Sequence, residues 1–177
     1  MEGGVHTAVI GGWHGAPGAD KSQVHWFSIH ATRTKHPWAY DKDNPQLHIA
    51  SLELYGTLLM YRELVRFHAD LAAHFSIALP IATDNRGNAY QVTNAKAKND
   101  TAASMLMELA AAQYAHGLPI CLSHVYREQN EWADQLTHDD FSGFDPAKRL
   151  EPDEDTWHIL PELLAARRTK RNAKTKR

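Results

Sequence analysis

Cysteine is almost absent from this chain: Cys121 is the only one in 177 residues. A single cysteine excludes an internal disulfide framework and a cysteine-based zinc site. No apolar stretch reaches the length of about 18 residues that crosses a bilayer, so the sequence predicts no membrane partner. The first residues also lack the basic and apolar segments of a secretory signal. Together these absences predict an intracellular protein, in the cytoplasm or the nucleus.

Metal-binding histidine patterns are missing as well. The chain has 12 histidines, but none forms an HxxxH or HExxH pair, so we expect no histidine-rich metal site. The composition, 43% hydrophobic and 23% charged, is ordinary for a globular protein and excludes a disordered chain. The length fits one domain with a tail.

Charge is distributed unevenly. Residues 167–177 carry seven of the 19 basic residues and no acid; without them, 12 basic residues face 21 acidic ones, a net charge of −9. One interpretation is that this tail touches a polyanion such as nucleic acid. The other is a solvated, disordered end or a nuclear-localisation-like cluster. The residues proposed to bind nucleic acid there are Arg167, Arg168, Lys170 and Arg171.

The hydrophobic pattern predicts seven elements in the order β-β-α-β-α-β-α. Strands are expected at 7–14, 23–32, 76–83 and 119–126, and helices at 46–74, 100–116 and 130–138. Asp100 or Thr101 is expected to cap the second helix, and Gly117 to end it. This alternation predicts an α/β fold with a layered sheet. We expect a domain over 1–140, an extension over 141–166 and a basic tail over 167–177.

Three acidic residues occupy positions that can carry chemistry. Glu53 lies within the first predicted helix, Asp84 directly follows an apolar strand, and Asp134 lies one turn into the last helix. Carboxylates that converge at one sheet edge repel one another unless a cation neutralises them. Magnesium prefers such oxygen ligands and suits phosphodiester chemistry.

Each acid also has a structural interpretation. Glu53 fits an exposed helix residue, and Asp84 fits a turn that follows the strand. Asp134 fits an acid that complements the positive N-terminus of its helix. Convergence of all three residues favours the chemical interpretation.

Three motifs in order resemble the RNase H-like domain of retroelement reverse transcriptases. They are Ile-Ala-Ser-Leu-Glu-Leu at 49–54, Ala-Thr-Asp-Asn at 82–85, and Ser-His-Val-Tyr-Arg-Glu-Gln-Asn-Glu-Trp-Ala-Asp-Gln-Leu-Thr at 123–137. The last motif is the most specific, and the resemblance covers about residues 7–140. It implies an RNase H-like mixed sheet flanked by helices.

The resemblance also implies an activity, namely cleavage of the RNA strand of an RNA–DNA hybrid with two Mg²⁺ ions, or Mn²⁺ in their place. Glu53, Asp84 and Asp134 would be the metal ligands, and His124 would move a proton or help the product leave. An ordinary strand histidine is the other interpretation of His124. Arg127 and Trp132, with the tail, would contact the hybrid. The expected partners are the hybrid and the polymerase domain of a parent polyprotein.

One departure from the family pattern concerns its first metal ligand. The family has an aspartate at the end of an opening central strand that precedes a hairpin, whereas residues 8–14 and 24–32 already read as that hairpin. Asp20 is the only acid between the hairpin arms, and using it would leave one strand where two are needed. We therefore expect an N-terminally truncated copy of the domain. The alternatives are a catalytically inactive remnant that binds nucleic acid, and another nuclease of the same broad fold, such as a 3′–5′ exonuclease or an integrase-like enzyme.

Overall fold

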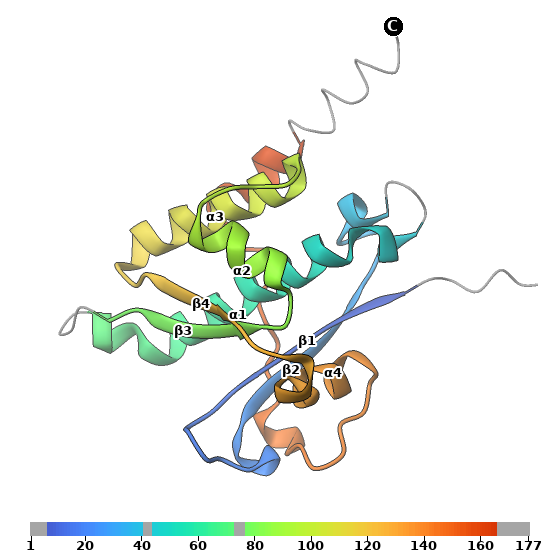
Figure 1. The fold of residues 1–177 in the computed structure, drawn as a ribbon, viewed down its shortest axis with the longest axis vertical. Helices are drawn as coiled ribbons and strands as arrows, with labels where there is room; N and C mark the ends of the chain where they lie inside the picture. Colours follow the sequence, from blue (N-terminus) through green and yellow to red (C-terminus); the bar gives the residue numbers. More distant parts are fainter. Residues whose placement is uncertain (1–6, 41–43, 73–76, 166–177) are drawn as a thin grey trace, which may run out of the picture.

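The computed structural model describes residues 7–40, 44–72 and 77–165 (Figure 1). The described residues form an antiparallel hairpin, a parallel strand pair and four α-helices. The strands are β1 (Ala8–His14), β2 (His25–Ala31), β3 (Leu79–Thr83) and β4 (Ile120–His124). The helices are α1 (Ile49–Ala72), α2 (Arg86–Thr93), α3 (Asp100–His116) and α4 (Glu131–Thr137). The mixed α/β class predicted from the sequence is confirmed.

The hairpin of β1 and β2 forms where β-branched and aromatic residues predict it. Its register runs from Ala8 opposite Ala31 to His14 opposite His25. Helix α4 packs directly on β1, and Gly11 permits this close approach. A Cβ at Gly11 would lie 2.7 Å from Leu136 Cβ and 2.9 Å from the backbone oxygen of Ala133. The hairpin thereby fixes the position of the helix that carries Asp134.

The parallel pair β3 and β4 brings two predicted motifs to one edge. Leu79, Ile81 and Thr83 are buried and alternate with exposed residues, as in a strand covered on one face. Thr83, the last residue of β3, lies opposite His124, the last residue of β4. Because parallel strands end at the same sheet edge, the segments that follow β3 and β4 leave from that edge.

Helix α1 is the centre of the core. It contacts β1, β3 and α3, so both strand pairs pack against the same helix. Helix α1 can be this long because other elements cover its apolar side chains along most of its length. The fully buried large side chains of this face are Leu52, Leu54, Leu58, Leu59 and Tyr61.

The structure departs from the sequence-based expectations in three places. The described strands form two separate two-stranded sheets rather than one layered sheet. Helix α2 is not among the predicted elements, because its short sequence has little apolar periodicity. The N-cap of α3 is Asn99, whose side chain accepts a hydrogen bond from Ala102 N, and not Asp100 or Thr101. Gly117 ends α3 in the left-handed region, as expected.

Residues 141–165 pack into the same body. Phe144 joins a small cluster with Trp26 and Leu136, and Leu160 lies in the main core. The carboxylate of Glu108, buried in α3, accepts hydrogen bonds from the backbone N–H groups of residues 158–160. The extension expected over 141–166 is therefore anchored, as far as residue 165, to the fold that precedes it.

No helix in the described ranges is both long and apolar enough to traverse a bilayer.

Candidate functional site

The first predicted ligand, Glu53, is held at the end of β3 by a neighbouring amide. Glu53 is half-buried in α1, and its carboxylate accepts a hydrogen bond from the side chain of Asn85. The Asn85 side-chain oxygen in turn accepts from Asn88 N at 2.9 Å and caps α2. Asn85 thus ties the carboxylate on α1 to the start of α2.

Asp84 stands next to this pair, between β3 and the cap of α2. Burial is the largest cause of a raised Glu53 pKa, while the Asn85 hydrogen bond lowers that pKa. The charge of Asp84 raises it again, and the charge of Arg127 lowers it. The charges of Glu53 and Asp84 therefore interact.

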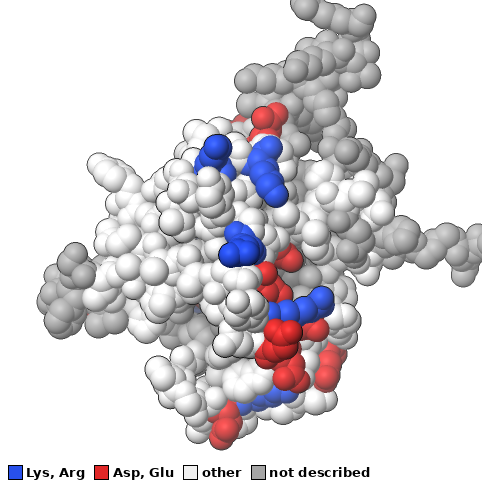
Figure 2. All heavy atoms as spheres, in the orientation of Figure 1, with Lys and Arg blue, Asp and Glu red and all other residues white. Residues whose placement is uncertain are grey.

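Asp134 reaches the same region through Arg127. An Arg127 guanidinium N–H donates to an Asp134 carboxylate oxygen at 2.8 Å, and the two form an ion pair. The hydrogen bond to Asp134 is the largest cause of the raised Arg127 pKa, and the charges of Asp84 and Glu53 raise it further. All three predicted carboxylates act on this one cation. Figure 2 shows acidic side chains gathered over α4, with basic ones among and above them.

The donor chemistry of this site fits magnesium, because carboxylate oxygens are the ligands this ion prefers. Within the described ranges, no three side chains of His, Cys, Asp or Glu stand close enough to hold one ion together. The Arg127 guanidinium supplies the positive charge near the carboxylates. Cation binding by all three would require Asp134 to leave Arg127 and approach Glu53 and Asp84.

Two further predicted residues differ in exposure. His124 is exposed at the end of β4, and its ring packs edge-on against Tyr126 with the ring centres 5.7 Å apart. Trp132 is half-buried and lies 4.7 Å from the Trp13 ring, between ring centres. The indole of Trp132 therefore packs against the small cluster that contains Trp26, Leu136 and Phe144. Only part of the indole ring is free to contact a ligand.

No protein-family model, no curated protein and no solved structure matches this chain.

Sequence reasoning missed two features of this site. The sequence motif includes Asn85 but does not reveal its double role as helix cap and Glu53 donor; an Asn directly after a strand and before a helix is the available signal. Arg127 is expected from the sequence to face nucleic acid, and its pairing with Asp134 is a feature that only the structure shows. The predicted binding residues of the tail, Arg167, Arg168, Lys170 and Arg171, lie outside the described residues.

Proposed function

We propose that this chain is an RNase H-like nuclease domain that acts on the RNA strand of an RNA–DNA hybrid. The observation that supports it best is that Glu53, Asp84 and Asp134, which come from three separate elements, all interact electrostatically with Arg127. These are the positions at which the family motifs have their metal ligands.

The arrangement of the strands agrees with this proposal. Both strand pairs pack against α1, yet they do not pair with each other in the described residues. In an RNase H-like sheet, a central strand would lie between β1 and β3. Two strand pairs on one helix are compatible with the two halves of such a sheet.

Each residue of the site has a part in this proposal. Glu53, Asp84 and Asp134 would bind the cations, and Asn85 holds Glu53 in place for that purpose. Bound Mg²⁺ would supply an activated water and stabilise the leaving oxygen of the cleaved phosphodiester. His124, exposed at the same edge, would take part in proton movement or product release. Arg127 would move from Asp134 to a phosphate of the hybrid.

A second candidate is a domain of the same fold that binds nucleic acid without cutting it. The ion pair of Arg127 with Asp134 favours it, because this pairing removes one carboxylate from the other two. The spacing of the acids favours it as well.

Magnesium-dependent cleavage of an end-labelled RNA–DNA hybrid distinguishes the two candidates. The nuclease predicts cutting that is lost in Asp84→Asn and kept in Asp70→Asn, since Asp70 is an exposed acid of α1 outside the site. Hybrid binding without cutting, by a folded chain, would support the second candidate. Cutting that survives in Asp84→Asn would contradict the proposed site.

A further inference from the structure

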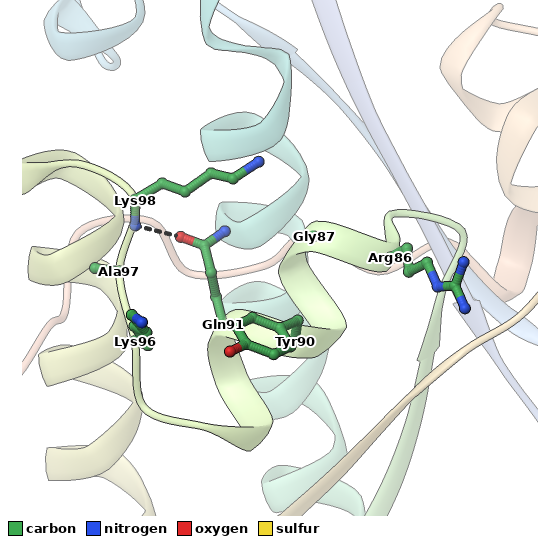
Figure 3. Close-up of a pocket in the computed structure, with 7 residues that line it drawn as sticks. All are labelled: Arg86, Gly87, Tyr90, Gln91, Lys96, Ala97 and Lys98. Carbon is green, nitrogen blue, oxygen red and sulfur yellow. Dashed lines mark hydrogen bonds between the residues drawn. The ribbon is translucent and has the colours of Figure 1, made fainter.

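A basic hollow lies beside the sheet edge at which β3 and β4 end, and it takes no part in the proposed chemistry. It measures about 440 Å³ and is lined by α2 and the loop that follows it (Figure 3). The lining residues are Arg86, Gly87, Tyr90, Gln91, Lys96, Ala97 and Lys98.

The hollow is positively charged, whereas the chain without its basic tail has a net charge of −9. Three of its lining residues, Arg86, Lys96 and Lys98, are cationic and none is acidic. No carboxylate in the described ranges forms an ion pair with any of the three, although other basic residues such as Arg62 and Arg127 are paired. Like charges around one hollow repel each other, and a bound anion relieves that repulsion.

Buried hydrogen bonds hold the wall of the hollow in shape. Asn88, fully buried, donates to the backbone oxygen of Ala50 on α1 at 2.9 Å and accepts from the Gln91 amide at 3.1 Å. The Gln91 side-chain oxygen accepts from Lys98 N at 2.8 Å, as drawn in Figure 3. This relay fixes the loop that carries Lys96 and Lys98 against α1, so the two lysines are presented by a rigid frame.

An exposed aromatic ring completes the hollow. Tyr90 projects from α2 with 57% of its surface exposed. In Figure 3 Lys96 and Lys98 come from the loop after α2, whereas the side chain of Arg86 points away from both of them. Two lysines on one loop can meet neighbouring phosphates of a chain, and an exposed ring offers a face on which a base can stack.

We propose that this hollow binds a single-stranded segment of nucleic acid, with an unpaired base stacked on Tyr90 and its phosphates at Lys96 and Lys98. Stacking on Tyr90 needs a base that is free of its partner, so the site prefers single strands over duplexes. The site does not involve Glu53, Asp84 or Asp134, and it stands independently of the proposed nuclease activity.

The test is fluorescence anisotropy of a labelled ten-nucleotide oligothymidylate with the full chain. Tyr90→Ala is expected to weaken binding about tenfold, because one base loses its stacking partner. Tyr114→Ala is the matched control, since Tyr114 is 93% exposed on α3 and lies outside the hollow.

Charge is tested by salt dependence. Replacing Lys96 and Lys98 by Gln is expected to reduce the slope of log affinity against log salt by about 1.4, at about 0.7 for each phosphate that is no longer neutralised. Lys148→Gln, outside the hollow, should leave that slope unchanged. Asp84→Asn should bind the oligonucleotide as the unchanged chain does, which separates this site from the carboxylates.

Three results would overturn the proposal. The first is equal binding by Tyr90→Ala and Tyr114→Ala, and the second is an unchanged salt slope in the double lysine variant. The third is equal affinity for a blunt duplex and for the single strand. Displacement of the oligonucleotide by thymidine monophosphate at equal concentration would also count against a strand, because it would assign the site to a free nucleotide.

Discussion

The side-chain amide of Asn85 donates a hydrogen bond to the carboxylate of Glu53 and joins the end of β3 to α1. The same side chain caps α2 through its oxygen. One residue thus fixes the helix that leads into the basic hollow and the carboxylate proposed to bind metal. Its amide favours the ionised form of Glu53, which is the form that a cation needs.

Asn85→Ser tests this link. Serine retains an oxygen that can cap α2, but its side chain is too short to reach Glu53. Burial already raises the pKa of Glu53, and loss of the Asn85 hydrogen bond should raise it further. A carboxyl with a raised pKa binds its proton more tightly in the folded state, so its contribution to stability falls as pH rises through that pKa. Carbon-13 NMR titration of Glu53 measures the shift, and an unchanged or lower pKa in Asn85→Ser contradicts the assigned role.

His14 should make the fold sensitive to acid. Burial lowers the pKa of His14 from 6.5 to about 4, and the charges of His25 and His68 contribute to this lowering. The unfolded chain therefore binds this proton more readily, and stability is lost as pH falls from about 6.5 to about 4. Allowing for partial solvent exposure, we expect a loss of about 1 kcal/mol.

His14→Phe should remove this acid sensitivity. His14 Nε2 is buried without a hydrogen-bond partner among the described residues, so a phenyl ring loses no bond there. Phe67 already packs edge-on against this ring at 4.6 Å between centres. Urea unfolding at pH 7 and pH 4.5 measures the difference, with His116→Phe on the exposed end of α3 as control. An equally acid-sensitive His14→Phe would show that other groups are responsible.

Glu108 should be essential for anchoring the segment after residue 141. Its buried carboxylate accepts three backbone N–H groups, at 2.7 to 2.9 Å. Glu108→Gln replaces one acceptor oxygen by a donor and should cost about 3 kcal/mol, because buried N–H groups lose their partners. Urea unfolding measures the cost, and hydrogen exchange at residues 158–160 should become faster.

Glu63→Gln is the matched control for this prediction. Glu63 and Glu108 are equally buried, at 1% exposure, but Glu63 pairs with the exposed Arg66. Its replacement should leave exchange at 158–160 unchanged. If both variants alter that exchange to the same extent, the anchoring role of Glu108 is wrong.

Gly11→Ala should displace the helix that carries Asp134. The added methyl group would meet Leu136 Cβ at 2.7 Å, which is closer than real contacts allow. Overpacking of this kind costs about 1–3 kcal/mol, and here α4 would have to shift. Thermal unfolding gives the loss of stability, and chemical-shift changes in α4 locate the shift. A stable variant with an unperturbed α4 would indicate that helix and strand pack less tightly than this distance implies.

Much of the fold could be predicted from the sequence because its elements have strong periodic patterns. The helix expected at 100–116 coincides with α3, and all four strands lie within their predicted ranges. Pairing between the strands could not be predicted in the same way, since alternation identifies a strand but not its neighbour. The two separate sheets are visible only in three dimensions.

The candidate site was predictable to a similar degree. The positions of Glu53 and Asp84 relative to a strand end follow from local pattern, and their proximity follows from the topology. The Arg127 ion pair depends on how α4 lies against β1, and the three N–H groups at Glu108 depend on a contact 50 residues away. Contacts of that kind leave no periodic signal in a sequence.

The most direct test of the central claim is Mn²⁺ binding, followed by electron paramagnetic resonance, in competition with Mg²⁺. If the carboxylates at the end of β3 and on α4 act as one cation site, Asp84→Asn and Asp134→Asn should each lose most of the Mg²⁺-displaceable binding. Asp70→Asn, which removes an exposed acid of α1, should retain it. Equal Mn²⁺ binding in all three variants and the unchanged chain would contradict a shared site.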